Sequence, residues 1–294
     1  MRNLKILLFL ALFYSCTKLE IPDSTELTST RTYLSDVQYV DSLQIFTMAS
    51  QENLKAAPIV PRVYSMTTFA IRDQGSLGSC TGFAGAEVVE ILFYTKTNKF
   101  VRFSPLFVYY CERCKINNKT IASDGGSSVG NVPISLQRYG VCLETSYVYS
   151  GFVNSIAYKT APSVSAMSEG LKYKVTTSGS VSIGDTATAK YLLRSKTPLV
   201  LGFNVYDNTN YSVFERMTIL NYTYNPLSTN GSVLSNLKLL GMHAVVIVGY
   251  DDVKGVFICQ NSFGVSWGNK GFFNLPYSVF KSSSIVSSIY FCKI

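Results

Sequence analysis

The stretch that decides the fold runs from Arg72 to Phe93 and reads R-D-Q-G-S-L-G-S-C-T-G-F-A-G-A-E-V-V-E-I-L-F. The glycines that follow Gln74 predict a turn. Cys80 then opens an apolar segment that is long enough for a helix, with Ser79 placed to cap it. Because this segment has little polar face, we expect a helix buried in the middle of a domain. The small residues that would let other backbone approach it closely are Gly82, Ala84, Gly85 and Ala86.

Cys80 has two possible roles at the start of this helix. A thiol on the first turn meets unpaired backbone N–H groups and the positive end of the helix dipole, and both favour the nucleophilic thiolate. The alternative is a small buried hydrophobic residue, which is what most free cysteines are. The stretch by itself leaves both interpretations open.

The composition indicates a globular protein. Only 15% of the 294 residues are charged, whereas the chain has 20 tyrosines and 18 phenylalanines. The formal net charge of +8 is spread along the sequence and forms no basic helix face and no basic-aromatic stripe. A stripe of that kind would bind along a nucleic-acid backbone. We therefore expect no nucleic-acid partner.

The N-terminus reads as a targeting segment covering residues 1–16. Arg2 and Lys5 precede an apolar run, residues 6–14, that is too short to span a bilayer. Ser15 before Cys16 resembles the processing site of a bacterial lipoprotein, in which the cysteine carries the lipid. Cleavage after Ser15 without lipidation is the alternative. Either way we expect an exported protein, secreted or periplasmic, or tethered to a membrane through Cys16.

The remaining chain divides by composition. Residues 17–60 are polar and rich in Ser and Thr, which predicts a spacer or a short pro-segment. Residues 61–294 carry the regular patterns, mainly helical over about 70–165 and β-rich over about 166–294, so the fold class is α+β. Residues 207–240 have only weak strand character. Further helices are predicted from Ser104-Pro105, at 134–139 and at 187–195, and strands at 198–206, 243–250, 256–261, 271–275 and 287–292.

His243 is the only histidine in the chain, and it opens a buried strand. The turn residues 251–255 predict a hairpin between this strand and the next. If Tyr250 pairs with Val256, Asn261 stands one diagonal step from His243, and a shift of one pair brings the two directly opposite. In both registers the Asn261 amide lies within reach of the imidazole.

Cys80, His243 and Asn261 together fit nucleophilic catalysis. A cysteine nucleophile needs a base to take its proton, and the base needs a third group that fixes its tautomer and orientation. The oxyanion formed on a carbonyl substrate needs fixed donors. Gln74 and the backbone N–H of Cys80 are placed to supply them.

Three blocks resemble the papain-like cysteine peptidases. They are Q-G-S-L-G-S-C ending at Cys80, G-M-H-A-V-V-I-V-G-Y-D around His243, and N-S-F-G-V-S-W-G-N-K-G-F-F from Asn261, in the chain order of that family. The resemblance covers about residues 61–294. The segments S-P-L-F-V-Y-Y and Y-G-V-C look more like the short bacterial and archaeal branch than the lysosomal cathepsins.

The resemblance implies a fold and an activity. The fold is two-lobed, with the nucleophile helix in a helical lobe, His and Asn in an antiparallel β-barrel-like lobe, and the active site in the cleft between them. The activity is hydrolysis of protein or peptide substrates by a monomer that needs no cofactor. The residues implied are Cys80 as nucleophile, His243 as general base and acid, Asn261 as orienter, Gln74 as oxyanion donor, and Gly125, Gly126 and Trp267 at the substrate site.

Three positions depart from the pattern of that family. Leu77 stands where the family often has a disulfide cysteine, and Thr81 stands where it has tryptophan. Phe263 replaces the tryptophan that shields the His–Asn hydrogen bond from water, so we expect a less shielded bond. These departures keep an alternative open, in which an inactive papain-like scaffold acts as a surface binding protein.

The other cysteines suggest no disulfide framework. Cys111 and Cys114 form a C-x-x-C that is compatible with a metal or redox site, but no second pair lies nearby in the sequence. We therefore expect no metal. Cys259 falls in an apolar strand and is expected in the core.

Overall fold

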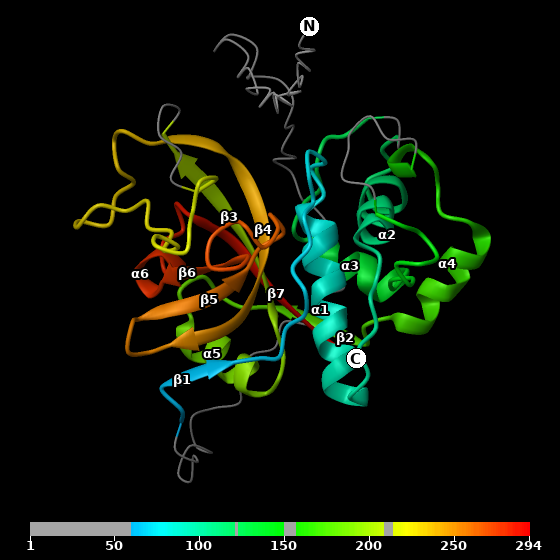
Figure 1. Ribbon diagram of the computed structural model, residues 1–294, viewed down its shortest axis with the longest axis horizontal. Coiled ribbons are helices and arrows are strands. Elements are labelled where there is room, and N and C mark those ends of the chain that lie inside the picture. The colour runs from blue at the N-terminus through cyan, green and yellow to red at the C-terminus, as the bar shows by residue number, and fades with distance from the viewer. Residues whose placement is uncertain (1–59, 121–122, 150–156, 209–213) are drawn as a thin grey trace, which may run out of the picture. The chain divides into compact units, whose positions relative to one another are not determined.

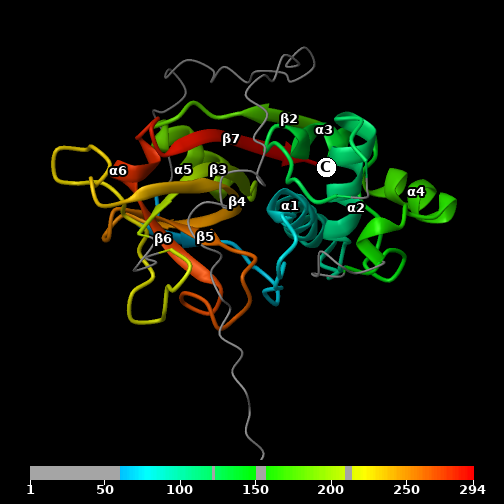
Figure 2. The ribbon, with the colours of Figure 1, turned by 90° about the horizontal axis from the view of Figure 1, so that it is seen from above.

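The computed structural model describes residues 60–294, except 121–122, 150–156 and 209–213 (Figure 1). The predicted signal segment 1–16 with Cys16, and all but the last residue of the predicted spacer 17–60, lie outside the described residues. Within the described part, helices α1 to α4 gather on one side, and the antiparallel sheet lies on the other together with α5 and α6 (Figure 2). This is the expected α+β, two-lobe fold.

The helices and strands expected from the sequence are present, with short elements between them. The helices are α1 (Cys80–Thr97), α2 (Pro105–Tyr110), α3 (Asn131–Arg138), α4 (Val164–Gly170), α5 (Thr186–Arg194) and α6 (Tyr277–Phe280), and a π-helix (Cys111–Ile116) continues α2. The strands are β1 (Val63–Ser65), β2 (Thr177–Ser180), β3 (Leu199–Asp207), β4 (Lys238–Asp251), β5 (Val256–Gln260), β6 (Phe272–Pro276) and β7 (Val286–Lys293).

Helix α1 begins at Cys80, as predicted, but Ser79 does not cap it. The Ser79 side chain makes no capping hydrogen bond, because its Oγ instead lies 2.6 Å from the hydroxyl of Tyr149. By contrast, Ser104 caps α2 as expected, accepting from Phe107 N at 3.1 Å. A serine at the N-cap position therefore does not cap the helix when its hydroxyl has a stronger hydrogen-bond partner elsewhere in the fold.

Gly82 permits a close crossing of α1 and α2. A Cβ at this position would lie 2.4 Å from the carbonyl oxygen of Pro105 and 2.9 Å from Tyr109 Cβ. The 2.4 Å distance between such a Cβ and the Pro105 oxygen is too short for any side chain, because a backbone oxygen cannot rotate away. The expectation that small residues in α1 let another backbone approach is confirmed here.

The sheet has the strand order β2-β7-β3-β4-β5-β6, and β1 pairs with β4 off this path. In the hairpin, Tyr250 lies opposite Phe257, so the predicted pairing with Val256 is wrong by one residue. An irregularity between Ile247 and Gly249 then shifts the register, so that Val246 lies opposite Gln260. The bulge restores the diagonal placement of Asn261 relative to the strand that carries His243.

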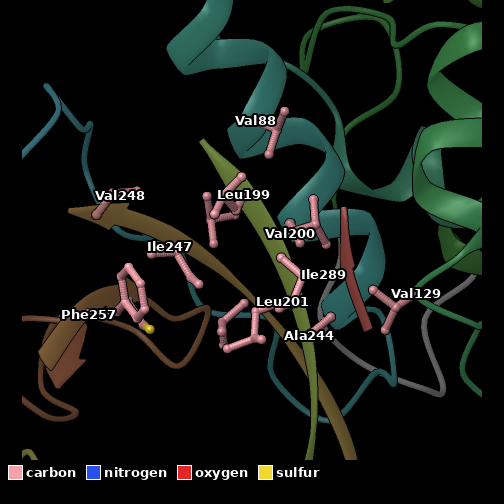
Figure 3. Packing of buried hydrophobic residues seen from close by; sticks show 14 of the residues in the cluster. Val88, Val129, Leu199, Val200, Leu201, Ala244, Ile247, Val248, Phe257 and Ile289 are labelled. Atoms are coloured by element: carbon pink, nitrogen blue, oxygen red, sulfur yellow. The ribbon is translucent and has the colours of Figure 1, made fainter. Parts of the chain in front are cut away.

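The main core lies where α1 packs against the sheet. Figure 3 shows Val88 of α1 near Leu199 and Val200 of β3, with Ile289 of β7 beside them and Ile247 of β4 further along the sheet. All five side chains are buried. This packing sets α1, which begins at Cys80, against the sheet whose strand β4 carries His243.

The 207–240 region consists mostly of turns and single β-bridges where it is described. Its last three residues, 238–240, extend β4 beyond the predicted strand. Phe214 and Tyr224 are nevertheless fully buried. The region therefore contributes to the core of the sheet side even though its sequence shows no clear periodicity.

Candidate active site

His243 and Asn261 are brought together by the β4–β5 hairpin. His243 lies within β4, and Asn261 directly follows β5. The ring nitrogen Nε2 of His243 is 2.7 Å from Asn261 Oδ1. The same oxygen accepts the backbone N–H of Ser262 at 2.8 Å. The amide oxygen is thus held from the backbone side, and it fixes the plane and orientation of the imidazole.

Aromatic rings cover this hydrogen bond. The Phe263 ring lies 4.8 Å from the His243 ring, and the Phe214 ring lies 5.8 Å away from it. Asn261 is only 1% exposed and His243 only 7% exposed. The hydrogen bond is therefore buried although position 263 holds phenylalanine instead of tryptophan. Phenylalanine at 263 covers the imidazole directly, and Phe214, which sequence reasoning did not single out, covers it further.

Trp267 supports this aromatic layer. Its ring packs against Phe263 at 5.6 Å and Phe214 at 5.2 Å, and its Nε1 donates to Phe214 O at 2.9 Å. The tryptophan is buried. The hydrogen bond to Phe214 therefore attaches the poorly patterned 207–240 region to the rings that cover His243. Aromatic residues in this otherwise polar stretch are the sequence signal that could have indicated the role.

Gln74 lies beside the segment that begins at Asn261. Its Oε1 accepts the hydroxyl of Ser262 at 2.6 Å, and its backbone N–H donates to Ser262 O at 2.9 Å. Its Nε2 donates to Leu77 O at 3.0 Å. Since a primary amide has two N–H bonds, one remains for another acceptor. Ser262 thus determines which end of the Gln74 amide is the donor.

Cys80 is half-buried and occupies the first position of α1. The N–H groups of the first helical turn have no partner inside the helix, which makes them available to an anion. Thr81 stands where the family pattern has tryptophan, and its side chain makes a polar contact instead of an apolar one. Its Oγ1 lies 2.5 Å from Glu112 Oε2, and both residues are buried.

Glu112 is a buried acid that sequence reasoning missed. Burial raises the pKa of its carboxyl to about 8, although hydrogen bonds from Thr81 and Ser127 oppose the shift. A neutral carboxylic acid beside α1 places no negative charge there that would oppose a thiolate at Cys80. In the sequence, Glu112 stood out only as the second residue of the C-E-R-C segment 111–114.

The D-G-G loop lies against the turn that precedes Cys80. Asp124 Oδ2 accepts Gly78 N at 2.8 Å, and Asp124 Oδ1 accepts the Tyr109 hydroxyl. Gly126 N donates to Tyr109 OH at 3.1 Å. The backbone of this loop is thus positioned next to the proposed nucleophile turn, where Gly125 and Gly126 were predicted to line the substrate site.

Arg113 holds the same loop from the π-helix. Its guanidinium donates to the carbonyl oxygens of Gly126 at 3.1 Å and Thr120 at 3.3 Å, and also to that of Ser123 at 2.5 Å. A Cβ on Gly125 would lie 3.0 Å from Arg113 Nη1. Glycine at 125 therefore lets the loop lie directly over the guanidinium.

The cysteines of the described residues other than Cys80 are free thiols without metal-site geometry. Cys111, Cys142, Cys259 and Cys292 are buried, and Cys114 is half-buried. Burial raises the pKa of Cys111 above its ordinary value. In the described part of the chain, no group of three or more His, Cys, Asp or Glu residues could hold a metal ion.

Comparisons with known proteins identify the family to which this chain is similar. Residues 61–292 match the family model described as papain family cysteine protease. An uncharacterized peptidase C1-like protein of Acanthamoeba polyphaga mimivirus is 30% identical over 227 residues, which cover 74% of this chain and 68% of that protein. Cathepsin K of Gallus gallus is 25% identical over 76% of this chain and 60% of the relative.

Solved structures show the same fold. The cysteine protease xylellain from Xylella fastidiosa superimposes with a TM-score of 0.74 at 26% identity, covering 90% of this chain and 96% of xylellain. Bromelain of Ananas comosus, in complex with the E64 inhibitor, has a TM-score of 0.57 at 20% identity over 80% of this chain and 100% of its own, and shows the fold alone. The chain belongs to the papain family of cysteine proteases.

Proposed function

We propose that this chain is an exported peptidase that cleaves peptide bonds through Cys80 and His243 by way of a covalent acyl-enzyme. The observation that carries the proposal is the 2.7 Å contact between His243 Nε2 and Asn261 Oδ1. Because Asn261 Oδ1 also accepts a backbone N–H, this oxygen is an acceptor for the imidazole, and Nε2 carries a proton. Nδ1 is then the nitrogen that exchanges a proton with the thiol.

The first half of the reaction forms a thioester. Cys80 transfers its proton to His243, and the thiolate attacks the substrate carbonyl carbon, so that a C–S bond forms and the carbonyl electrons move onto oxygen. Gln74 Nε2 and the Cys80 backbone N–H donate to this oxyanion. The C–N bond then breaks, and His243 gives its proton to the departing amine.

The second half releases the acid product. His243 takes a proton from a water molecule, and the resulting hydroxide attacks the thioester carbonyl. The same donors stabilise the second oxyanion. The C–S bond breaks, and the proton on His243 returns to Cys80. Gly125 and Gly126 line the substrate site with backbone, and Trp267 supports it from within.

Labelling and cleavage test the assignment together. The purified full chain, under reducing conditions, is expected to cleave members of a peptide library and to lose activity when a thiol-directed epoxide modifies Cys80. Cys80→Ala should be inert, whereas Cys114→Ala, which removes another half-buried free thiol, should keep wild-type rates. An unmodified Cys80 and no cleavage would overturn the proposal.

Export and tethering form a separate part of the proposal. They are supported by the N-terminal segment with Cys16. In the part of the chain that the structure describes, no helix combines the length and apolar character needed to cross a membrane. Cys16→Ser is expected to move the chain from the membrane fraction to the soluble exported fraction. An unchanged membrane fraction would argue against a lipid at Cys16.

A surface binding protein is the second candidate. Thr81 and Phe263 favour it, since both replace tryptophans of the family pattern. Cys80→Ala separates the two functions, because a binding protein would keep its full biological effect in this variant and a peptidase would lose it.

A further inference from the structure

Tyr149 bridges the two ends of the turn that precedes Cys80. Its hydroxyl donates to the carbonyl oxygen of Gln74 at 2.7 Å and lies 2.6 Å from Ser79 Oγ. A phenol has only one proton, and here it goes to Gln74, so Ser79 is the donor in the second bond. One oxygen atom thus sets the distance between the backbone of Gln74 and the residue just before the nucleophile.

Tyr149 is itself held by groups outside this turn. Its backbone N–H donates to Glu144 Oε1 at 2.7 Å, and the other carboxyl oxygen of Glu144 lies 3.5 Å from Arg72. The ring meets the Phe83 ring edge-on at 4.6 Å. Burial raises the pKa of Tyr149, so the phenol remains a neutral donor. The backbone and ring of Tyr149 are therefore held by groups other than the two turn residues that its hydroxyl contacts.

We infer that Tyr149 is a positioning residue for the oxyanion site, holding Gln74 and the backbone of Cys80 at the spacing that a tetrahedral intermediate requires. The inference rests on the proposed function, which makes these two groups the oxyanion donors. Donors of this kind stabilise the transition state only when they are fixed before the reaction. Small misplacements are costly, and about 1 Å can lower a rate by up to about a hundredfold.

The test compares two conservative variants of the full chain. Tyr149→Phe keeps the ring and removes only the bridging oxygen. Tyr147→Phe is the matched control, because its hydroxyl donates to the Thr160 carbonyl at 2.6 Å on the exposed surface. We expect Tyr149→Phe to lower kcat about tenfold with KM within about twofold, a change of the size expected for one weakened oxyanion contact. Tyr147→Phe should match wild type.

Two reagents separate positioning from a general structural role. A peptide aldehyde forms a hemithioacetal on Cys80 whose oxygen occupies the oxyanion site, whereas iodoacetamide alkylates the thiol without using that site. Tyr149→Phe should weaken aldehyde affinity about as much as it lowers kcat/KM and should leave the alkylation rate close to wild type. A merely structural effect would change both reactions and would lower the unfolding midpoint in parallel.

A double variant tests the route through Gln74. If Tyr149 acts through this residue, Tyr149→Phe should cost less in a Gln74→Ala background than in wild type. Wild-type kinetics and aldehyde affinity in Tyr149→Phe would overturn the inference. If Tyr149→Phe is unstable, Ser79→Ala removes the other partner of the bridge and should weaken aldehyde affinity in the same direction.

Failure of the proposed function has a different signature. In that case wild type itself would cleave no peptide and Cys80→Ala would change nothing. Aldehyde binding, measured by calorimetry, needs no turnover, and it would still report whether Tyr149 positions the donors beside Cys80.

Discussion

Glu112 is an acid without exposed surface, one hydrogen bond from the residue that follows Cys80. Desolvation is the main cause that raises its pKa to about 8 from an ordinary value of 4.5. Because the folded pKa lies above the unfolded value, the folded chain binds this proton more tightly. The stability that it contributes is complete below about pH 4.5 and is lost as the pH rises through about 8.

Replacing Glu112 by glutamine should weaken this pH dependence. Glu112→Gln is neutral at every pH, so its free energy of unfolding should fall less than that of wild type between about pH 5 and 9. Urea unfolding at several pH values measures the slope. A residual slope is expected, because burial also raises the pKa of Glu87 to about 8. Glu215→Gln, at an exposed position, is the control, and an unchanged slope in Glu112→Gln would contradict the assignment.

The crossing of α1 and α2 depends on Gly82. In Gly82→Ala the new methyl group would meet the Pro105 carbonyl at 2.4 Å, and the backbone cannot move aside without separating the helices. We expect a loss of about 1–3 kcal/mol in the free energy of unfolding, as for other overpacked sites. Urea unfolding provides the measurement.

Gly85→Ala is the matched control in the same helix. Its methyl group would meet the Val108 side chain at 2.9 Å and the Val132 side chain at 3.2 Å. Side chains can rotate, and alanine gains up to about 1 kcal/mol of helix propensity over glycine. Gly85→Ala should therefore cost less than Gly82→Ala, and the opposite order would show that the two helices do not cross where the structure places them.

The D-G-G loop should affect substrate binding more than turnover. Asp124→Ala removes the acceptor for Gly78 N and for Tyr109, while Arg113 still holds the loop carbonyls. We expect KM to rise about tenfold, since a hydrogen bond to a charged group contributes about 1.5–3 kcal/mol, with a smaller change in kcat. Steady-state kinetics on one peptide substrate measure both.

Asp185→Ala is the control for this carboxylate. Asp185 accepts the backbone N–H of Thr188 at 2.9 Å and caps α5. Its loss should cost about 1 kcal/mol of stability and leave KM unchanged. If Asp185→Ala raises KM as much as Asp124→Ala does, the effect is one of general stability and the loop has no specific role.

Arg72 links segments that are far apart in the sequence. Its guanidinium lies 3.0 Å from Glu90 and 3.5 Å from Glu144, and it donates to the Phe103 carbonyl at 2.8 Å. Glu90 is only 2% exposed, and Arg102 is its second cation at 3.1 Å. The ion-pair network therefore ties the segment before the Gln74 turn to α1 and to the chain that comes after this helix.

Removing Arg72 should destabilise the whole fold. Arg72→Ala leaves a buried carboxylate with one cation, and breaking such pairs typically costs about 3–5 kcal/mol. Arg102→Ala should cost less, because Arg102 is more exposed and Glu90 keeps Arg72. Urea unfolding of both variants and of wild type measures the two losses in the free energy of unfolding. Equal losses would mean that the carboxylate depends on both cations alike.

The sequence alone determined the secondary-structure elements that depend on neighbouring residues. The turn and the helix beginning at Cys80, the Ser104 cap of α2 and the hairpin joining His243 to Asn261 all depend on residues within about twenty positions of one another. Periodicity, caps and turn residues act over that range. The pairing next to the turn was predicted one residue off, and the bulge between Ile247 and Gly249 that restores the predicted placement of Asn261 leaves no local sequence signal.

Only the tertiary structure decided the contacts between distant segments. The Ser79 side chain contacts Tyr149, 70 residues away, instead of capping α1. Phe214 reaches the site from a stretch without a readable pattern, and Glu112 reaches it from the π-helix that continues α2. The physical reason is that a side chain near several partners takes the one whose hydrogen bond or packing is best after folding. The sequence pattern indicates which residues can form a helix or strand. The partner of each side chain depends on which surfaces come into contact when the chain folds.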